Sequence, residues 1–126
     1  MLQKTKVVKM ARKALESLYD GTCTITEHQK VKKPNGSTGF HDVPVLTDQP
    51  CRISYKTVDT NNQSESGGSA VVQVTELFIA PEIDIKPGSK ITVTQHGQTV
   101  DYQMSGKPAM YDTHQEVILD LFKEWS

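Results

Sequence analysis

The clearest structural signal in the chain is the stretch ITVTQHGQTVDYQM, residues 91–104. A turn at His96-Gly97 would fold this stretch into a β-hairpin. In the resulting register, apolar residues of the two arms face each other in two cross-strand pairs, Ile91 with Tyr102 and Val93 with Val100. Because these four side chains share one face, the stretch predicts a half-buried antiparallel pair of strands.

Two further runs, upstream of the hairpin, alternate between apolar and polar residues. In the first run, Cys23 and Ile25 follow Gly21 and alternate with threonines. The turn sequence KPNG at residues 33–36 would fold residues 37–46 back against this run as a hairpin arm. Pro44 places the returning segment at a sheet edge, because proline cannot donate a hydrogen bond to a strand ladder.

The second alternating run follows a break at residues 48–50. Cys51, Ile53 and Tyr55 alternate there with polar residues, so both cysteines of the chain fall on apolar faces. We expect Tyr55, Phe78 and Tyr102 to belong to the core. The two cysteines are too few and too far apart for a disulfide scaffold, and we expect them to be small buried hydrophobic residues.

Residues 57–69 separate this run from the next apolar stretch. They contain one aliphatic side chain and cannot bury enough surface to offset the entropy of ordering, so they predict a mobile loop. Residues 70–81 are apolar again and predict a long strand. The apolar positions change parity near Thr75-Glu76, which predicts a β-bulge at that point.

The N-terminal segment has the spacing of a helix. From Thr5 to Tyr19, apolar residues recur at intervals of three and four, with Thr5 as the expected cap and Gly21 as the expected stop. The opposite side of this helix carries four cations: Lys6, Lys9, Arg12 and Lys13. Such a cluster is typical of a solvated helix face and also of a phosphate-binding surface.

The C-terminal segment fits two structures. Val117, Leu119 and Leu121 alternate as in a strand, whereas a capping box from Thr113 to Glu116 would begin a helix. We favour the strand because a barrel or sandwich needs a closing strand. The sequence therefore predicts a mainly β fold, a small antiparallel β-barrel or sandwich with one N-terminal α-helix and a long inter-strand loop.

The 126 residues suit one domain, with a helix in residues 1–20 and a barrel in residues 21–126. No apolar run exceeds four residues and no secretory signal is visible, so we expect a cytosolic product that does not enter a membrane.

Charge is divided unevenly: residues 1–56 carry ten Lys or Arg and five Asp or Glu, whereas residues 57–126 carry four and ten. This polarity suits a nucleic acid on one face, contacts between copies of the chain, or simple solvation.

No set of residues has the spacing of a reaction centre. The residues of zinc-binding type lack paired spacing: Cys23, His28, His41 and Cys51. A thiol nucleophile needs a base beside it, whereas both cysteines alternate with core residues. His114 and Glu116 would share a strand face and could form an acid–base pair, but no nucleophile accompanies them. We therefore expect no enzymatic activity, no metal and no cofactor.

Four segments, taken in order, resemble the head-completion (stopper) proteins of the head-to-tail connector of tailed bacteriophages and prophages. These segments are PCRISYK at residues 50–56, LFIAP at 77–81, IKPGSKI at 85–91 and SGKPAMY at 105–111. The resemblance runs from about Gly21 to the C-terminus. It rests on segment order and loop placement.

The resemblance implies a small β-barrel subunit of the virion that forms a ring with copies of itself. Its partners would be a portal or adaptor protein above, a tail protein below, and packaged DNA in the channel, bound without sequence specificity. Residues 57–69 would take the gating position that closes the channel, with Thr57, Asp59, Asn61, Asn62, Glu65, Gly67 and Gly68 as the gating residues. Assembly would take place in the bacterial cytoplasm.

Two alternatives to the stopper function remain. Within the same class, the chain could be an adaptor or a tail terminator. In a different class, it would be a nucleic-acid-binding β-barrel whose basic N-terminal helix contacts phosphates through the four cations named above.

Overall fold

The computed structural model describes residues 2–59 and 71–125. One helix is followed by seven strands in this part of the chain, which confirms the expected mainly β class. The elements are α1 (Leu2–Glu16), β1 (Gly21–Lys32), β2 (Thr38–Asp59), β3 (Val71–Ile79), β4 (Lys90–Gln95), β5 (Gln98–Met104), β6 (Ala109–Met110) and β7 (Gln115–Leu121).

The hydrogen-bonded strands close on themselves. Their order is β3-β2-β1-β4-β5-β7-β6, every pairing is antiparallel, and β3 also pairs with β7. The sheet is therefore a ring of strands, although not a strict barrel, and we call it the closed sheet. Closure removes most of the unpaired strand edges that an open sheet would expose.

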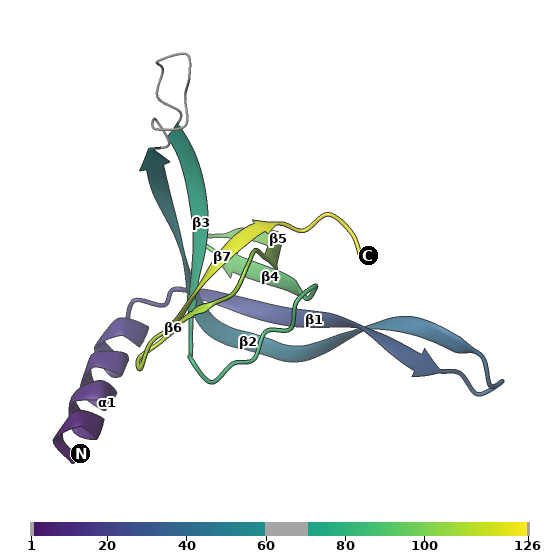
Figure 1. Cartoon of the computed structure of the whole chain (residues 1–126), viewed down its shortest axis with the longest axis horizontal. Helices are drawn as coiled ribbons and strands as arrows, with labels where there is room; N and C mark the ends of the chain where they lie inside the picture. Colours follow the sequence, from purple (N-terminus) through teal and green to yellow (C-terminus); the bar gives the residue numbers. More distant parts are fainter. Residues whose placement is uncertain (1, 60–70, 126) are drawn as a thin grey trace.

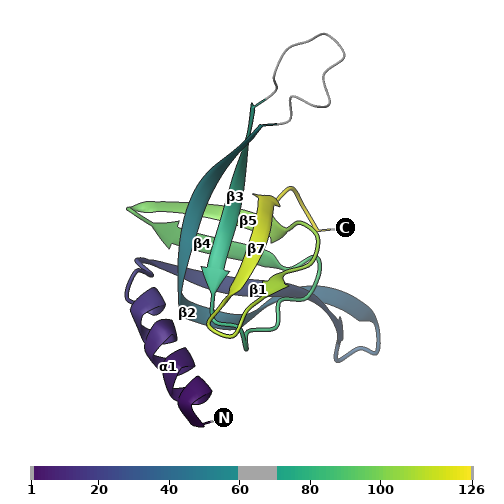
Figure 2. The same cartoon turned by 60° about the vertical axis from the view of Figure 1, so that its left-hand side comes forward.

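Two extensions of the closed sheet project from it in different directions, as does helix α1 (Figures 1 and 2). The first extension, which we call the arm, is the part of β1 and β2 beyond β4, residues 27–43. The second, which we call the ribbon, is the part of β2 and β3 beyond β7, residues 56–59 and 71–74. Each extension is two-stranded, so neither encloses a core.

The core fills the inside of the closed sheet. Apart from Ile85, which lies between β3 and β4, its members alternate along the strands with outward-facing residues, as a pleated strand requires. They are Cys23, Ile25, Cys51, Ile53, Leu77, Ile79, Ile85, Ile91, Val93, Tyr102, Val117 and Leu119. Both cysteines are buried free thiols, as expected. The pKa of the Cys51 thiol is raised by its hydrogen bond with Cys23 and by burial, which keeps this thiol protonated and unreactive.

One glutamine joins two strands that do not belong to the same ladder. The Gln95 side chain accepts a hydrogen bond from the Ile53 N–H at 2.7 Å and donates one to the Ile53 carbonyl at 3.1 Å. A Cβ atom on Gly21 would lie 3.0 Å from Gln95 Oε1, so the glycine leaves room for this bridge. β2 continues past Gly21, the first residue of β1, and the Gln95 amide forms the two hydrogen bonds that a neighbouring strand would otherwise form with Ile53.

The hairpin of residues 91–104 has the expected register. Ile91 pairs with Tyr102 and Val93 pairs with Val100. His96 and Gly97 both have positive φ angles, 53° and 76°, as the two central residues of a type I′ turn require. The C-terminal segment forms strand β7, so the favoured strand is confirmed over the helix.

One expected strand break and one expected bulge are different in the structure. The expected break at residues 48–50 lies inside the continuous strand β2. Asp48 has a φ of 52° there, and the pairing with β1 shifts register nearby, so a bulge bends the strand without ending it. Conversely, the bulge expected at Thr75-Glu76 is absent, because β3 pairs with β2 without any shift from Ile79 to Val71. The parity of its apolar residues changes in the ribbon, where neither face is inside a core.

Three further expectations are corrected. Thr5 does not cap the helix but lies within α1, and Gly21 does not stop it but opens β1. Tyr55 is 58% exposed because it lies where β2 leaves the closed sheet. Phe78 is half-buried on the outer face of β3 and contacts a ring there, so of the three aromatic residues only Tyr102 belongs to the core.

Candidate interaction surfaces

Helix α1 is tethered to the closed sheet through its polar side. Arg12 forms ion pairs with Glu16 at 2.9 Å and with Glu82, which lies in the turn after β3. These carboxylates raise the pKa of the Arg12 guanidinium and keep it charged. Arg52 in β2 donates a hydrogen bond to the Leu18 carbonyl at 3.2 Å, just after the helix ends. Both arginines therefore fix the direction in which the helix points.

Much of the apolar side of the same helix is left uncovered, although Val8 and Leu15 are half-buried. Val7, Met10 and Leu18 are 63%, 66% and 54% exposed, and Ala11 and Ala14 between them are exposed too. Figure 2 shows the helix standing beside the closed sheet rather than lying across it. Amphipathic spacing predicted this helix, and part of its apolar side remains exposed in the structure.

The four cations named from the sequence have different surroundings. Lys6, Lys9 and Lys13 are exposed on α1. Arg12 is held by Glu16 and Glu82, so its guanidinium already has two carboxylate partners. The basic surface expected on this helix is therefore carried by the lysines.

The expected gating segment is only partly within the described residues. Thr57 and Asp59 belong to strand β2 and not to a loop, since they pair with Gln73 and Val71 in the ribbon. This corrects the start of the segment. Five of its residues lie outside the described part of the chain: Asn61, Asn62, Glu65, Gly67 and Gly68.

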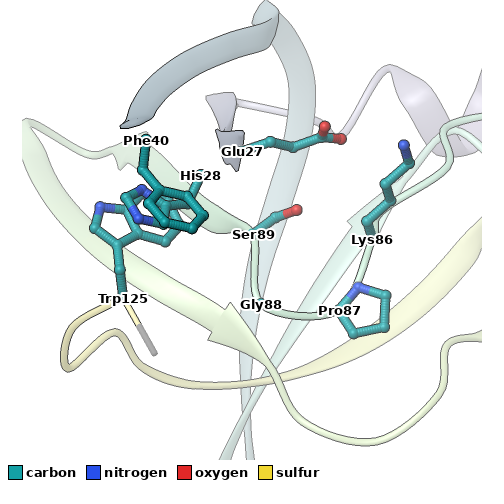
Figure 3. A pocket seen from close by; sticks show the side chains of 8 residues that line it. All are labelled: Glu27, His28, Phe40, Lys86, Pro87, Gly88, Ser89 and Trp125. Atoms are coloured by element: carbon teal, nitrogen blue, oxygen red, sulfur yellow. The ribbon is translucent and has the colours of Figure 1, made fainter. Parts of the chain in front are cut away.

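An aromatic cluster links the arm to the C-terminal segment (Figure 3). The His28 ring on β1 is stacked between Phe40 at 4.8 Å and Trp125 at 4.9 Å, with interplanar angles of 9° and 12°. Asp42 on β2 bonds His28 Nδ1 at 3.0 Å. The Lys90 ammonium lies 5.5 Å from the centres of both the Trp125 and Phe122 rings. We call these residues the tail clasp.

Charge as well as stacking holds the tail clasp together. The hydrogen bond between Asp42 and His28 holds the pKa of the Asp42 carboxyl below its ordinary value, and Trp125 and Lys90 also lower this pKa. The clasp borders a pocket of about 250 Å³ that Glu27, Lys86 and Ser89 also line. Sequence reasoning missed this cluster, because no local pattern connects residues from opposite ends of the chain.

His114 and Glu116, weighed from the sequence as an acid–base pair, do meet. His114 Nε2 lies 2.9 Å from Glu116 Oε2, and its Nδ1 lies 2.9 Å from the Thr113 hydroxyl. The ring is stacked on Tyr111 at 4.8 Å and meets the edge of Phe78 at 5.6 Å. Both ring nitrogens are thus engaged with side chains of the protein.

The other residues weighed for chemistry do not come together in one site. Cys23 and Cys51 lie in the core and His28 lies in the tail clasp, and the described residues contain no group of three side chains placed to hold a metal ion. Within the same residues, the one helix is too short and too polar to span a lipid bilayer.

Comparison with known proteins yields one weak structural likeness. No family model and no curated protein matches the sequence. A solved structure of the xkdH protein, from the phage-like element PBSX of Bacillus subtilis, aligns at 15% identity with a TM-score of 0.46. The alignment covers 79% of this chain and 91% of that one. A likeness of this degree carries no argument about function, so the function has to be argued from the molecule itself.

Proposed function

We propose that this chain is a non-enzymatic subunit of a phage head-to-tail connector, of the stopper type, which joins copies of itself in a ring below the portal. The observation that carries the proposal is helix α1, which is held in place by two arginines and keeps much of its apolar side uncovered. A helix presented in this way suits a component that is completed by assembly.

The position of the resembling segments supports the same proposal. PCRISYK lies in β2, LFIAP ends β3, IKPGSKI leads into β4, and SGKPAMY contains β6. Except for Lys56, which begins the ribbon, they therefore belong to the closed sheet and its turns, and none lies in the arm or in α1. In this proposal the closed sheet is the shared scaffold, and the projections differ according to the neighbours that a subunit meets.

The absence of catalysis is part of the proposal. Its main support is His114, whose two nitrogens are bonded by Thr113 and Glu116, so that neither is directed toward a substrate. The two thiols are buried in the core, where they are hydrogen-bonded to each other. We infer a mechanical role in which surfaces, rather than a reaction centre, do the work.

Channel closure is assigned to the segment that joins β2 and β3, on the strength of the family resemblance. Asp59 and Glu65 are the only charged residues from 57 to 69, and both carry the same sign as DNA phosphates. Packed DNA would therefore be repelled rather than held, and could slide once the channel opens.

A turn replacement tests this assignment. Asp59 pairs directly with Val71, so residues 60–70 can be replaced by Asn-Gly, a two-residue turn like the one between β4 and β5. We expect the variant to fold as the parent does, while filled heads that carry it lose DNA, measured as nuclease-sensitive genome. The matched control replaces residues 33–37 at the tip of the arm by the same turn, between the paired Lys32 and Thr38. Retained genomes and normal infection with the first variant would refute channel closure.

A further inference from the structure

We propose that helix α1 is a docking helix for an acidic amphipathic helix of another protein. The inference deepens the proposed function, since it rests on the chain being an assembly subunit and names the chemistry of one neighbour. The docking surface consists of Val7, Met10, Ala11 and Ala14 of α1 together with Leu18 in the turn that follows the helix, and we call it the seam.

The spacing of the seam selects a helical partner. Val7, Ala11, Ala14 and Leu18 follow one another at intervals of four, three and four, which is the apolar spacing of a coiled-coil interface. Small residues at the centre, Ala11 and Ala14, allow the axis of a second helix to come close. A strand or an irregular loop would match this narrow, straight stripe less well.

The attachment of α1 keeps the seam available. Arg12 and Glu16 lie on the side of the helix that meets Glu82, away from the seam. An isolated helix of about 12–15 residues is marginal in water even with favourable residues, so α1 gains little stability from its own backbone. A second helix on the seam would bury the apolar side chains of α1 that remain exposed.

Charge decides the character of the partner. Lys6 and Lys13 lie on the flank of the seam next to Met10, and the first turn of α1 has no acidic residue. Glu16, the only acidic residue in the helix, is paired with Arg12. Pairing with α1 of a second copy would bring these lysines together, and like charges at such positions disfavour the pair. The partner helix therefore carries Glu or Asp beside its apolar stripe.

Two other acidic surfaces are less suited to the seam. A helix that lies on an anionic membrane presents large side chains such as Trp, Phe and Leu, whereas two of the five seam residues are alanines. A DNA backbone would use the lysines and leave the apolar stripe uncovered. A protein helix with acidic residues beside its apolar stripe matches the lysines and the seam together.

A binding experiment with a defined probe tests the proposal. The probe is a fluorescent synthetic peptide of about three heptads, with leucine at positions a and d and glutamate at e and g. We expect the full chain to bind it, measured by anisotropy. Met10→Gln and Ala14→Gln should each weaken binding by about tenfold or more, because they remove apolar contact while keeping good helix formers.

Two comparisons make the result specific. Leu121→Gln changes a leucine that is 64% exposed in β7, close to the 66% of Met10, and should leave peptide binding unchanged. Lys6→Gln combined with Lys13→Gln should weaken binding and reduce its dependence on salt. Circular dichroism confirms that each variant keeps its fold.

The same variants measured on duplex DNA and on anionic phosphatidylserine vesicles separate the alternatives. The proposal is overturned if the parent chain does not bind the peptide, or if both seam variants bind it as well as the parent does. It is equally overturned if the chain prefers DNA or vesicles and needs only the lysines. Such a result would leave the connector proposal intact wherever the turn replacement still releases genomes. If binding depends on the seam but the turn replacement has no effect on genome retention, the docking helix is supported and channel closure is refuted.

Discussion

At the scale of single residues, one buried amide holds a turn that the closed sheet depends on. Gln115 is 1% exposed, and its Nε2 donates hydrogen bonds to the Ala80 carbonyl at 2.9 Å and to the Ile83 carbonyl at 2.6 Å. This turn also carries Glu82, the partner of Arg12. The amide therefore supports both the end of β3 and the tether of helix α1.

Replacing this amide should be costly although the new side chain has a similar shape. Gln115→Met removes the donor and leaves buried carbonyls short of a partner, so we expect a loss of about 1–3 kcal/mol in the free energy of unfolding. Urea denaturation measures it. Gln98→Leu, at an exposed site beside the β4–β5 turn, is the control and should change stability little. A midpoint for Gln115→Met equal to that of the parent would show that the amide has no such role.

At the scale of elements, the tail clasp ties the C-terminal segment to the arm and responds to acid. The pKa of Asp42 is lower in the folded chain than its ordinary value of 3.8, so the clasp gains stability from the carboxylate. That contribution is complete above pH 3.8 and is lost as the pH falls through the lowered value. Because Asp42 bonds the ring of His28, we expect its protonation to loosen the contact of Trp125 with His28.

Fluorescence can follow this loosening, because Trp125 is the single tryptophan of the chain. We expect its emission to shift to the red in acid before the closed sheet unfolds, as followed by far-ultraviolet circular dichroism. Asp42→Asn should remove the separate acid step, whereas Asp101→Asn, in the β4–β5 hairpin, should retain it. An emission maximum that changes only together with global unfolding in the parent would contradict the role of Asp42.

The elements also show what the sequence could and could not predict. The hairpin of residues 91–104 was predicted to its register, because a two-residue turn and two apolar pairs fix a purely local structure. The sequence pattern predicted two strands where β2 is continuous, because the bulge at Asp48 has the same turn-forming residues as a true break. The prediction of a bulge in β3 was wrong. In the ribbon neither face of the strands packs against a core, so the alternation of apolar and polar residues does not report register there.

The candidate surfaces were predicted only in part, for a similar reason. The lysines of α1 were named correctly as exposed cations, but nothing local shows that Arg12 would meet Glu82. The tail clasp depends on Trp125 reaching His28 from the other end of the chain. Contacts of this kind follow from how the sheet closes, and the pattern of apolar residues does not specify them.

At the scale of the whole molecule, the closed sheet buries the apolar core, and three projections extend from it. The arm, the ribbon and helix α1 each expose apolar side chains, among them Phe40, Val72 and Met10 at 61%, 47% and 66%. Residues 1–56 are basic on balance and residues 57–126 are acidic. A molecule with these surfaces suits heterologous contacts, in which different faces of neighbouring subunits meet.

Locating the chain within purified particles tests the central proposal most directly. Phage particles produced by a host that carries a tagged copy of this gene can be purified, imaged by electron cryo-microscopy and compared with untagged particles. The account predicts tag density in a ring at the junction of head and tail, with several copies of the chain per particle. Particles that contain a filled head and a joined tail but lack this chain would contradict it.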